Sequence, residues 1–243
     1  ALENYKQIKD FVKDTIAKNA PVIPVSAQHN INIDALIQAI EEIISTPKRD
    51  DTKDPLMFVA RSFDINKPGA EIKDLAGGVL GGALRQGKLK VGEEIEIRPG
   101  IKVEKQGKTI YEPLKTKIIS LKTGGISVKE VHPGGSIGLM TGLDPSLVKS
   151  DSLTGNVVGH PSKLPLINYE LNLKAHLLKR VVGTKEEIEV ELIKKGENLL
   201  LNVNSATTVG IVDEIKKDRF HVRLKIPVCA SKEDHVTISR ILG

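Results

Sequence analysis

The stretch from Met57 to Gly100 limits the possible folds of this chain more than any other part of the sequence. It begins with a β-prone run at 57–63 and ends with a run at 94–97 in which glutamate alternates with isoleucine. A period of two is typical of a strand with one buried face. Glycine is dense between these runs, and it permits positive φ angles, tight bends and the close approach of another backbone or a ligand. The stretch therefore predicts the wall of a small β-barrel with a glycine-lined edge.

The same kind of pattern continues on both sides of a proline-bounded segment at 161–165. From Leu56 to His160, turn residues recur at the short spacing of barrel hairpins and not at the spacing of βαβ units. Beyond residue 165, apolar residues alternate with polar ones in four runs, which predicts a second small barrel. The apolar positions of these runs are Leu171, Leu173, Ala175 and Leu177; Ile188, Val190 and Leu192; Leu199, Leu201 and Val203; and Phe220, Val222, Leu224 and Ile226.

The N-terminal part follows a different pattern. Apolar residues at helical spacing predict a helix over residues 2–18. A short apolar strand, Val22–Val25, is expected next, and then a second helix from Asn32 or Asp34 to Ile44. Helix–strand–helix is typical of the end of a doubly wound α/β domain, and so few residues cannot bury a core of that type. We expect this part to be the remnant of a larger domain.

The predicted fold class is therefore mainly β, with two consecutive small β-barrels preceded by the C-terminal helix–strand–helix remnant of an α/β domain. A charged, proline-bounded segment separates the remnant from the barrels and is expected to be a linker. The predicted parts are the remnant at 1–46, the linker at 47–55, the first barrel at 56–160 and the second barrel at 161–243.

The amino-acid composition limits which partners the protein can bind and in which cellular compartment we expect it. The net charge of +5 and the pI of about 9.1 favour an anionic partner such as RNA, although such an excess is also common in proteins that bind no nucleic acid. The single cysteine, Cys229, excludes an internal disulfide and a cysteine-based zinc cluster, and the histidines lack metal-ligand spacing. No run is apolar enough to cross a bilayer, and no signal-peptide pattern is present. We expect a cytoplasmic protein without a metal site.

Three partial matches to GTPase motifs lie within the first predicted barrel. Gly82–Lys88 fits G-x-x-x-x-G-K, but Leu89 replaces the hydroxyl residue that would hold Mg²⁺. Asp74–Gly77 fits D-x-x-G, and Asn66–Gly69 begins N-K-x-D but ends in glycine instead of the carboxylate that pairs with guanine. Their order along the chain is reversed and they fall between strands, so we interpret them as barrel turns.

Three segments of the first predicted barrel resemble the second domain of the gamma subunit of archaeal and eukaryotic translation initiation factor 2. They are 61–69 (RSFDINKPG), 77–82 (GGVLGG) and 86–92 (QGKLKVG), and the resemblance extends from about residue 1 to about residue 240. The first segment is the specific one, because 87–97 also resembles elongation factor Tu and indicates only the translational GTPase superfamily. The resemblance implies that residues 1–46 end a P-loop GTPase domain whose nucleotide motifs are absent here. GTP or GDP and Mg²⁺ would then bind in the intact parent, and we expect no GTP hydrolysis by this chain alone.

The resemblance also implies a binding site. In the family, the second domain docks on the GTP-bound G domain, and the aminoacylated 3′ end of initiator tRNA lies in the cleft between them. One wall of that cleft would come from this chain, with backbone exposed by glycine and an apolar lining for methionine from Val79, Leu80 or Phe63. Arg61 suits such a site because a guanidinium can bind phosphate or carboxylate in a bidentate way. The implied tRNA-binding and aminoacyl-binding residues are Arg61, Phe63, Asn66, Gly77, Gly78, Val79, Gly81, Gly82, Gly134, Gly135 and Ser136.

A Ser-Ala pair follows the predicted N-terminal strand. In translational GTPases such a pair presents backbone N–H groups to guanine O6, so Ser26, Ala27 and Gln28 are the implied guanine-binding residues. An ordinary strand-to-helix turn capped by Ser26 is the alternative. The family works as a heterotrimer, so the implied partners are the alpha and beta subunits, initiator methionyl-tRNA and the small ribosomal subunit. The implied function is GTP-dependent delivery of that tRNA to the ribosome.

Other interpretations remain open. The family continues past Arg240 into an Arg-Trp-Arg strand, whereas this chain has no tryptophan, which leaves the closure of the second barrel undecided. The segment 87–97 also fits an elongator-type or selenocysteine-specific aminoacyl-tRNA carrier. Aromatic residues, which commonly stack on unpaired bases, make up only 3% of the chain, and this would suit a non-catalytic barrel that docks proteins only.

Overall fold

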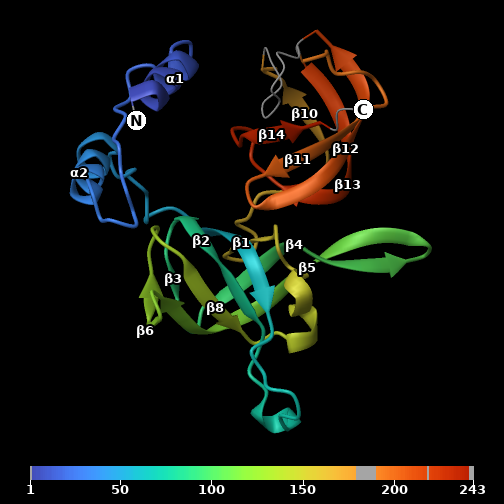
Figure 1. The fold of residues 1–243 in the computed structure, drawn as a ribbon. Helices are drawn as coiled ribbons and strands as arrows, with labels where there is room; N and C mark the ends of the chain where they lie inside the picture. Colours follow the sequence, from blue (N-terminus) through green and yellow to red (C-terminus); the bar gives the residue numbers. More distant parts are fainter. Residues whose placement is uncertain (1, 179–189, 218, 241–243) are drawn as a thin grey trace. The chain divides into compact units, whose positions relative to one another are not determined.

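The computed structural model describes residues 2–178, 190–217 and 219–240, and it divides into two units at 1–48 and 49–243 (Figure 1). Strands make up most of the regular structure, so the mainly-β prediction is confirmed.

The first unit contains two helices, α1 Leu2–Val12 and α2 Ile33–Ile43. Both carry an apolar stripe, yet no described residue between 2 and 48 is buried. The helix expected over 2–18 is shorter than predicted. The Thr15 hydroxyl donates to the Val12 carbonyl at 2.8 Å, and such side-chain bonds compete with the continuation of a helix.

The strand expected at Val22–Val25 is absent, which corrects the prediction. A strand needs a hydrogen-bonded neighbour, and no described residue of the first unit supplies one there. The segment after it forms a tight turn, in which Ser26 and Ile31 exchange two backbone hydrogen bonds of 3.1 Å. Asn32 follows with a positive φ of 56°, and its side chain donates to the Pro24 carbonyl at 2.8 Å. This bond holds the turn against the start of α2.

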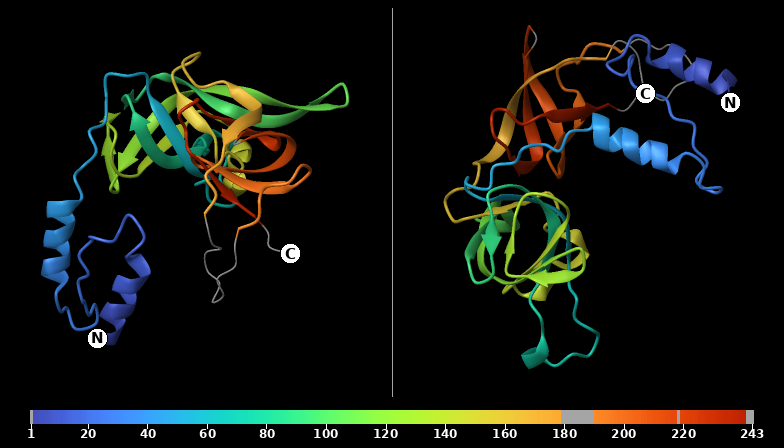
Figure 2. Two further views of the ribbon diagram at one scale, coloured as in Figure 1. Left: turned by 90° about the horizontal axis from the view of Figure 1, so that it is seen from above. Right: turned by 90° about the vertical axis from the view of Figure 1, so that its left-hand side faces the viewer.

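The second unit begins with a closed barrel. Its strands run in the order β4–β9–β1–β2–β8–β5–β6, and a further pairing of β4 with β5 closes the ring, which is seen nearly end-on in the right-hand view of Figure 2. Alternate residues fill the interior, where Met57, Leu80 and Leu139 are fully buried. The main strands are β1 Leu56–Phe63, β2 Val79–Gln86, β4 Glu94–Lys105, β5 Lys108–Thr123, β8 Ile137–Thr141 and β9 Val157–Gly159.

Short elements complete this barrel. β3 Leu89–Lys90 pairs with β7 Glu130–Val131, and β6 Ile126–Val128 pairs with β5. Three single turns of 3-10 helix lie in the connections: η1 Ile72–Asp74, η2 Pro145–Leu147 and η3 Lys149–Asp151. The segment expected as a linker is fastened to the barrel, because the Asp50 carbonyl accepts from Gly87 N–H at 2.8 Å and the Asp54 carbonyl accepts from Gln86 Nε2 at 2.9 Å.

The remaining strands form a five-stranded antiparallel sheet in the order β10–β13–β12–β11–β14. Among the residues that the structure describes, β10 and β14 do not pair with each other, so the second predicted barrel is an open sheet there. Its core contains Leu199, Leu201 and Val222. The strands are β10 Ile167–Lys174, β11 Asn198–Val203, β12 Ala206–Lys216, β13 Arg219–Cys229 and β14 Val236–Ser239.

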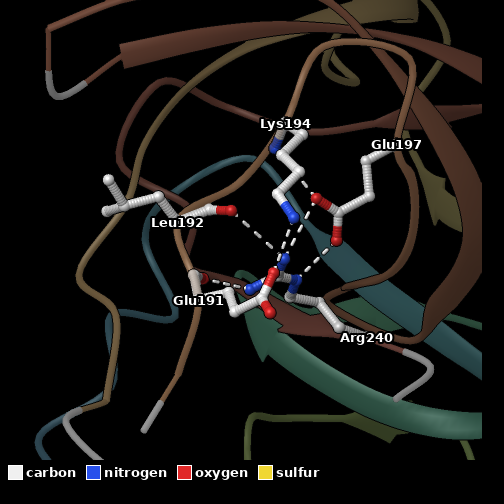
Figure 3. A network of polar contacts seen from close by, with 5 residues as sticks. All are labelled: Glu191, Leu192, Lys194, Glu197 and Arg240. Carbon is white, nitrogen blue, oxygen red and sulfur yellow. Dashed lines mark hydrogen bonds and ion pairs between the residues drawn. The ribbon is translucent and has the colours of Figure 1, made fainter. Parts of the chain in front are cut away.

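One of the four strands predicted for this sheet is not formed as expected. Ile188 lies outside the described residues, and 190–192 has no regular structure. These residues are held instead by Arg240, whose side chain donates to the Glu191 carbonyl and, at 3.3 Å, to the Leu192 carbonyl (Figure 3). Arg240 Nε also lies 2.5 Å from Glu197 Oε1. Burial raises the pKa of Glu197, but hydrogen bonds from Arg240 and from the Lys194 N–H outweigh it and leave the pKa below its ordinary value.

A buried ion pair joins the barrel to the sheet. Arg98 Nε lies 3.1 Å from Glu96 Oε1, and Arg98 Nη1 donates to the Leu164 carbonyl at 3.2 Å. Ser162 N–H donates to Glu96 Oε2 at 2.8 Å, so Glu96 and Arg98 both bind the connection into β10. Cys229 is buried in the adjacent apolar cluster, and burial raises the pKa of its thiol to about 12. Cys229 is therefore a small core residue.

Candidate functional site

The outer face of the barrel brings together several of the residues that the sequence singles out. Strands β1, β2, β8 and β5 are neighbours, and residues directly opposite each other point to the same face. One outward row runs across all four strands: Arg61 lies opposite Gly81, Gly81 opposite Gly138, and Gly138 opposite Lys122. We call these four residues the glycine row. A second outward row beside it contains Phe63, Val79 and Met140.

Arg61 is exposed but held in place. Its side chain is 70% exposed, and its Nε lies 2.9 and 3.1 Å from the two carboxylate oxygens of Asp151 in η3. Ser62 N–H donates to the same carboxylate at 2.9 Å. The hydrogen bond from Arg61, followed by that from Ser62, lowers the pKa of Asp151. Because this contact uses Nε, the two terminal nitrogen atoms of Arg61 have no partner in the part of the chain that the structure describes.

Three of the predicted site glycines serve the packing of the barrel itself. A Cβ on Gly77 would lie 1.8 Å from the Thr141 carbonyl oxygen, and a Cβ on Gly82 would lie 1.9 Å from that of Phe58. A Cβ on Gly78 would lie 2.5 Å from the Val148 side chain. These distances are shorter than any van der Waals contact, so glycine is needed for close approach to backbone at Gly77 and Gly82 and to a buried side chain at Gly78. Of the glycines at 77–82, packing thus accounts for three.

Gly81 is the exception. A Cβ there would meet nothing closer than the Arg61 Cβ at 3.6 Å, an ordinary contact, and its φ is not positive. Phe63 Cε1 lies 3.8 Å from the same point, and Phe63 is 40% exposed. The backbone at Gly81 is therefore open to the outside between a guanidinium and an aromatic ring.

Fewer apolar side chains line the outer face than the sequence predicts. Leu80 is fully buried and points into the barrel, because it alternates with the outward Val79 and Gly81. It cannot line an open pocket, which corrects that expectation. Val79 is only 9% exposed. Phe63 is thus the main exposed apolar side chain beside Gly81.

Asn66 closes the base of a loop. Its side chain donates to the Ala76 carbonyl at 2.8 Å and accepts from Ala76 N–H at 2.7 Å, while Asp64 Oδ1 accepts from Asn66 N–H at 2.9 Å. Both ends of the amide are therefore occupied within the chain. The backbone hydrogen bond from Asn66 opposes the effect of burial and lowers the pKa of Asp64. Asn66 therefore holds together the base of the loop that connects β1 to β2 and begins directly after Phe63.

The turn Gly134–Ser136 precedes β8, which supplies Gly138. Gly134 and Gly135 have φ angles of 137° and 67°, a region that favours glycine, and all three residues are exposed. The Ser136 carbonyl accepts from the Thr123 hydroxyl at 3.2 Å. The turn lies at the end of β8 where Ile137 pairs with Gly82, so it borders the face that carries Gly81.

In the first unit, Ser26, Ala27 and Gln28 lie in the turn before α2. The Ser26 N–H is already bonded to the Ile31 carbonyl, whereas Ala27 and Gln28 are exposed. No described residues form a group of three or more histidine, cysteine, aspartate or glutamate side chains suited to a metal. Within the described ranges no helix is long and apolar enough to cross a membrane.

Sequence reasoning missed Asp151 and Gly138. Asp151 follows its partner Arg61 by 90 positions, and no local pattern links the two. Gly138 alternates with the buried Ile137 and Leu139, which places it on the outer face, but its neighbours follow only from strand pairing.

Comparisons with known proteins found a matching family model, similar sequences and a solved structure of similar fold. A family model described as "Initiation factor eIF2 gamma, C terminal" matches residues 169–243. Gamma subunits of translation initiation factor 2 from Methanocaldococcus jannaschii and Pyrococcus horikoshii are each 58% identical over 243 residues. All of this chain is covered in both cases, and it spans 59% of the length of each relative. The crystal structure of the bacterial selenocysteine-specific elongation factor EF-Sec has a TM-score of 0.72 at 20% identity, with 98% of this chain and 34% of that chain covered, which shows a shared fold.

Proposed function

Because the chain belongs to the family of the gamma subunit of translation initiation factor 2, we propose that it is the part of such a subunit that holds initiator methionyl-tRNA for GTP-dependent delivery to the small ribosomal subunit. The identity of 58% over the whole chain supports the proposal. The chain spans 59% of the length of these relatives, and the binding of GTP and Mg²⁺ is part of the proposal for the complete subunit.

The observation that carries the proposal is the exposed backbone of Gly81 between Arg61 and Phe63. A guanidinium held by Asp151 is pre-ordered to bind a phosphate or carboxylate with its remaining N–H groups. The Phe63 ring offers an apolar surface for a methionine side chain or a terminal base. The turn Gly134–Ser136 borders this surface and adds exposed backbone.

The other predicted residues of the first barrel support the site by shaping the backbone around it. Gly77 and Gly82 allow close approach to the backbone of Thr141 and Phe58, and Gly78 leaves room for the Val148 side chain. Asn66 holds the loop after Phe63. The proposal also assigns contacts with guanine, in a complete G domain, to Ser26, Ala27 and Gln28; the exposure of Ala27 and Gln28 supports this. The alpha and beta subunits are the proposed protein partners, in the cytoplasm, as the family membership supports.

A tRNA-binding comparison tests this function. The complete gamma subunit, assembled with its alpha and beta subunits and loaded with GTP, is titrated with initiator and elongator methionyl-tRNA in a filter-binding assay. We expect tighter binding of the initiator form, and an Arg61→Gln variant should bind both less tightly because a charge-assisted contact is lost. Equal affinity for the two tRNAs in the wild-type complex would reject the initiator role.

A further inference from the structure

We propose that protonation of His132 holds residues 50–55 on the barrel and thereby sets the length of free chain between α2 and β1. We call residues 50–55 the docked segment. When the segment is seated, 44–49 is the free part of the connection, and when it is released, the free part is 44–55. The inference goes beyond the proposed function, because it concerns the connection between the two units of the chain and not the binding of tRNA.

Uncharged contacts hold both ends of the docked segment. The Asp50 carbonyl accepts from Gly87 N–H at 2.8 Å. The Asp54 carbonyl accepts from Gln86 Nε2 at 2.9 Å. A Cβ on Gly87 would lie 2.5 Å from Pro55 Cα, and the φ of Gly87 is 70°, so the segment fits against this turn only because the residue is glycine. None of these hydrogen-bonding groups titrates, so these contacts do not depend on pH.

A charged contact lies between these two ends. His132 Nδ1 lies 3.2 Å from Asp51 Oδ2, and His132 Nε2 lies 2.9 Å from Glu130 Oε1. An ionised carboxylate only accepts hydrogen bonds, so both contacts are satisfied only when both ring nitrogens carry a proton, as in the imidazolium ion. Asp51 has no other polar partner in the part of the chain that the structure describes. The geometry therefore fits the protonated ring.

Loss of a proton from His132 weakens the contact with Asp51 more than the contact with Glu130. Lys90 Nζ lies 2.9 Å from Glu130 Oε2, so Glu130 keeps a cation. The hydrogen bond from Lys90 is the main cause that lowers the pKa of Glu130, and the charge of His132 adds to it. A neutral ring with its proton on Nε2 keeps the shorter contact and turns a lone pair toward Asp51. A proton on Nδ1 instead leaves Asp51 a neutral donor, which binds a carboxylate more weakly than a charged one.

The other charged groups around the docked segment do not replace this contact. Those that line the same cavity are Lys53, Lys88, Lys90, Asp54, Glu93 and His160. His160 Nε2 lies 3.4 Å from Glu93 Oε2, which belongs to the barrel, and Lys163 Nζ lies 3.7 Å from Asp54 Oδ2. Among the described residues, His132 is thus the histidine with a polar contact to the docked segment.

Little apolar packing adds to these contacts. Residues 50–54 are exposed and Pro55 is buried, and a cavity of about 450 Å³ is lined by the segment and by residues within 88–93. One ion pair is therefore a sizeable part of the attachment. Release roughly doubles the free chain, from 44–49 to 44–55, and a longer tether lowers the effective concentration of one unit at the other.

Hydrogen exchange of the Gly87 N–H measures the attachment, because this amide is bonded to the Asp50 carbonyl. Protection factors, which correct for the intrinsic effect of pH on exchange, are measured in the complete gamma subunit at about pH 5.5 and about pH 8, near the two ends of the usual histidine range. The Thr141 N–H, bonded to the Gly78 carbonyl, is the reference amide in the barrel. We expect the protection of Gly87 relative to Thr141 to be about two- to fivefold higher at the lower pH, the range for one half-exposed ion pair.

Substitutions assign this difference to the proposed contact. His132→Gln and Asp51→Asn should each remove it, and the double variant should behave like either single variant, because both changes break the same interaction. His160→Gln is the matched control, since its ring contacts Glu93 of the barrel, and it should keep the difference.

The outcomes are distinct. Protection of Gly87 that does not change with pH in the wild type, or a change that persists in His132→Gln, would overturn the inference. A difference that is lost in His160→Gln and kept in Asp51→Asn would also overturn it, because the titrating contact would then lie within the barrel. No tRNA is present in this measurement, so its result is independent of the initiator role.

Discussion

At the scale of single residues, the adjacent glycines Gly81 and Gly82 have different structural roles. Gly82 faces the barrel interior, where a Cβ would overlap the Phe58 carbonyl oxygen at 1.9 Å, whereas Gly81 faces outward and has space for one. The alternation of a strand separates packing from exposure at neighbouring positions. The glycine-dense stretch is therefore not one uniform edge.

This difference predicts opposite effects of one substitution. Gly82→Ala should lower the free energy of unfolding by at least about 1–3 kcal/mol, because β2 must move away from β1. Gly81→Ala should change it by no more than about 0.4–1 kcal/mol, and in the stabilising direction, because alanine restricts the unfolded chain. Urea denaturation of both variants measures the two values. Similar losses in both would show that the assignment of faces is wrong.

At the scale of elements, η3 is attached to β1 through a carboxylate. Asp151 binds Arg61 Nε and the Ser62 N–H, and Ser62 Oγ accepts from Leu153 N–H at 3.0 Å. The 3-10 turn thereby holds the strand that carries the exposed guanidinium. A surface ion pair alone contributes little, but the additional backbone bonds give this one a defined geometry.

The lowered pKa of Asp151 gives this attachment a pH dependence. A carboxyl group whose pKa is lower in the folded state stabilises the fold above its unfolded pKa, about 3.9, and loses that contribution as pH falls through the folded value. Asp151→Asn should therefore be less stable than wild type at pH 7, and the gap should narrow below about pH 4. Thermal unfolding of both proteins from pH 7 to pH 3 measures the gap. A gap that stays constant with pH would argue against the ion pair.

At the scale of the whole second unit, the barrel and the five-stranded sheet are joined at Glu96 and Arg98. The side chains are 5% and 17% exposed, so both charges are largely removed from water. Burial raises the Glu96 pKa, but the hydrogen bonds from Ser162 and Arg98 outweigh it and keep the pKa below its ordinary value. Such a pair is sensitive to the loss of one partner.

Arg98→Ala should accordingly lower the free energy of unfolding by about 3–5 kcal/mol, because Glu96 is left buried without its counter-ion. The double variant with Glu96→Gln should recover part of this loss, since no isolated charge remains. Lys102→Ala, on the exposed hairpin of the same strand β4, is the matched control and should stay within about 0.5 kcal/mol. Chemical denaturation measures all three, and a loss for Arg98→Ala no larger than that of the control would contradict the role of the pair.

The sequence by itself determined the local features. Alternation predicted most of the strands, the density of turn residues predicted a barrel, and the run at 61–69 led to the family that the comparisons show. The sequence-based prediction was wrong where strand pairing decides the structure. Val22–Val25 has no partner strand and forms none itself. The second predicted barrel is an open sheet in its described residues. The alternation of apolar and polar residues is a property of the local sequence, whereas strand pairing depends on residues that are distant along the chain.

Only the tertiary structure decided what the site residues do. Strand pairing placed Lys122 in one row with Arg61, and chain folding brought Asp151 against that arginine. It also showed that Gly77, Gly78 and Gly82 are required by packing, while Gly81 is not. The physical reason is that a residue's role depends on atoms contributed by distant segments, and sequence patterns record only the spacing along the chain.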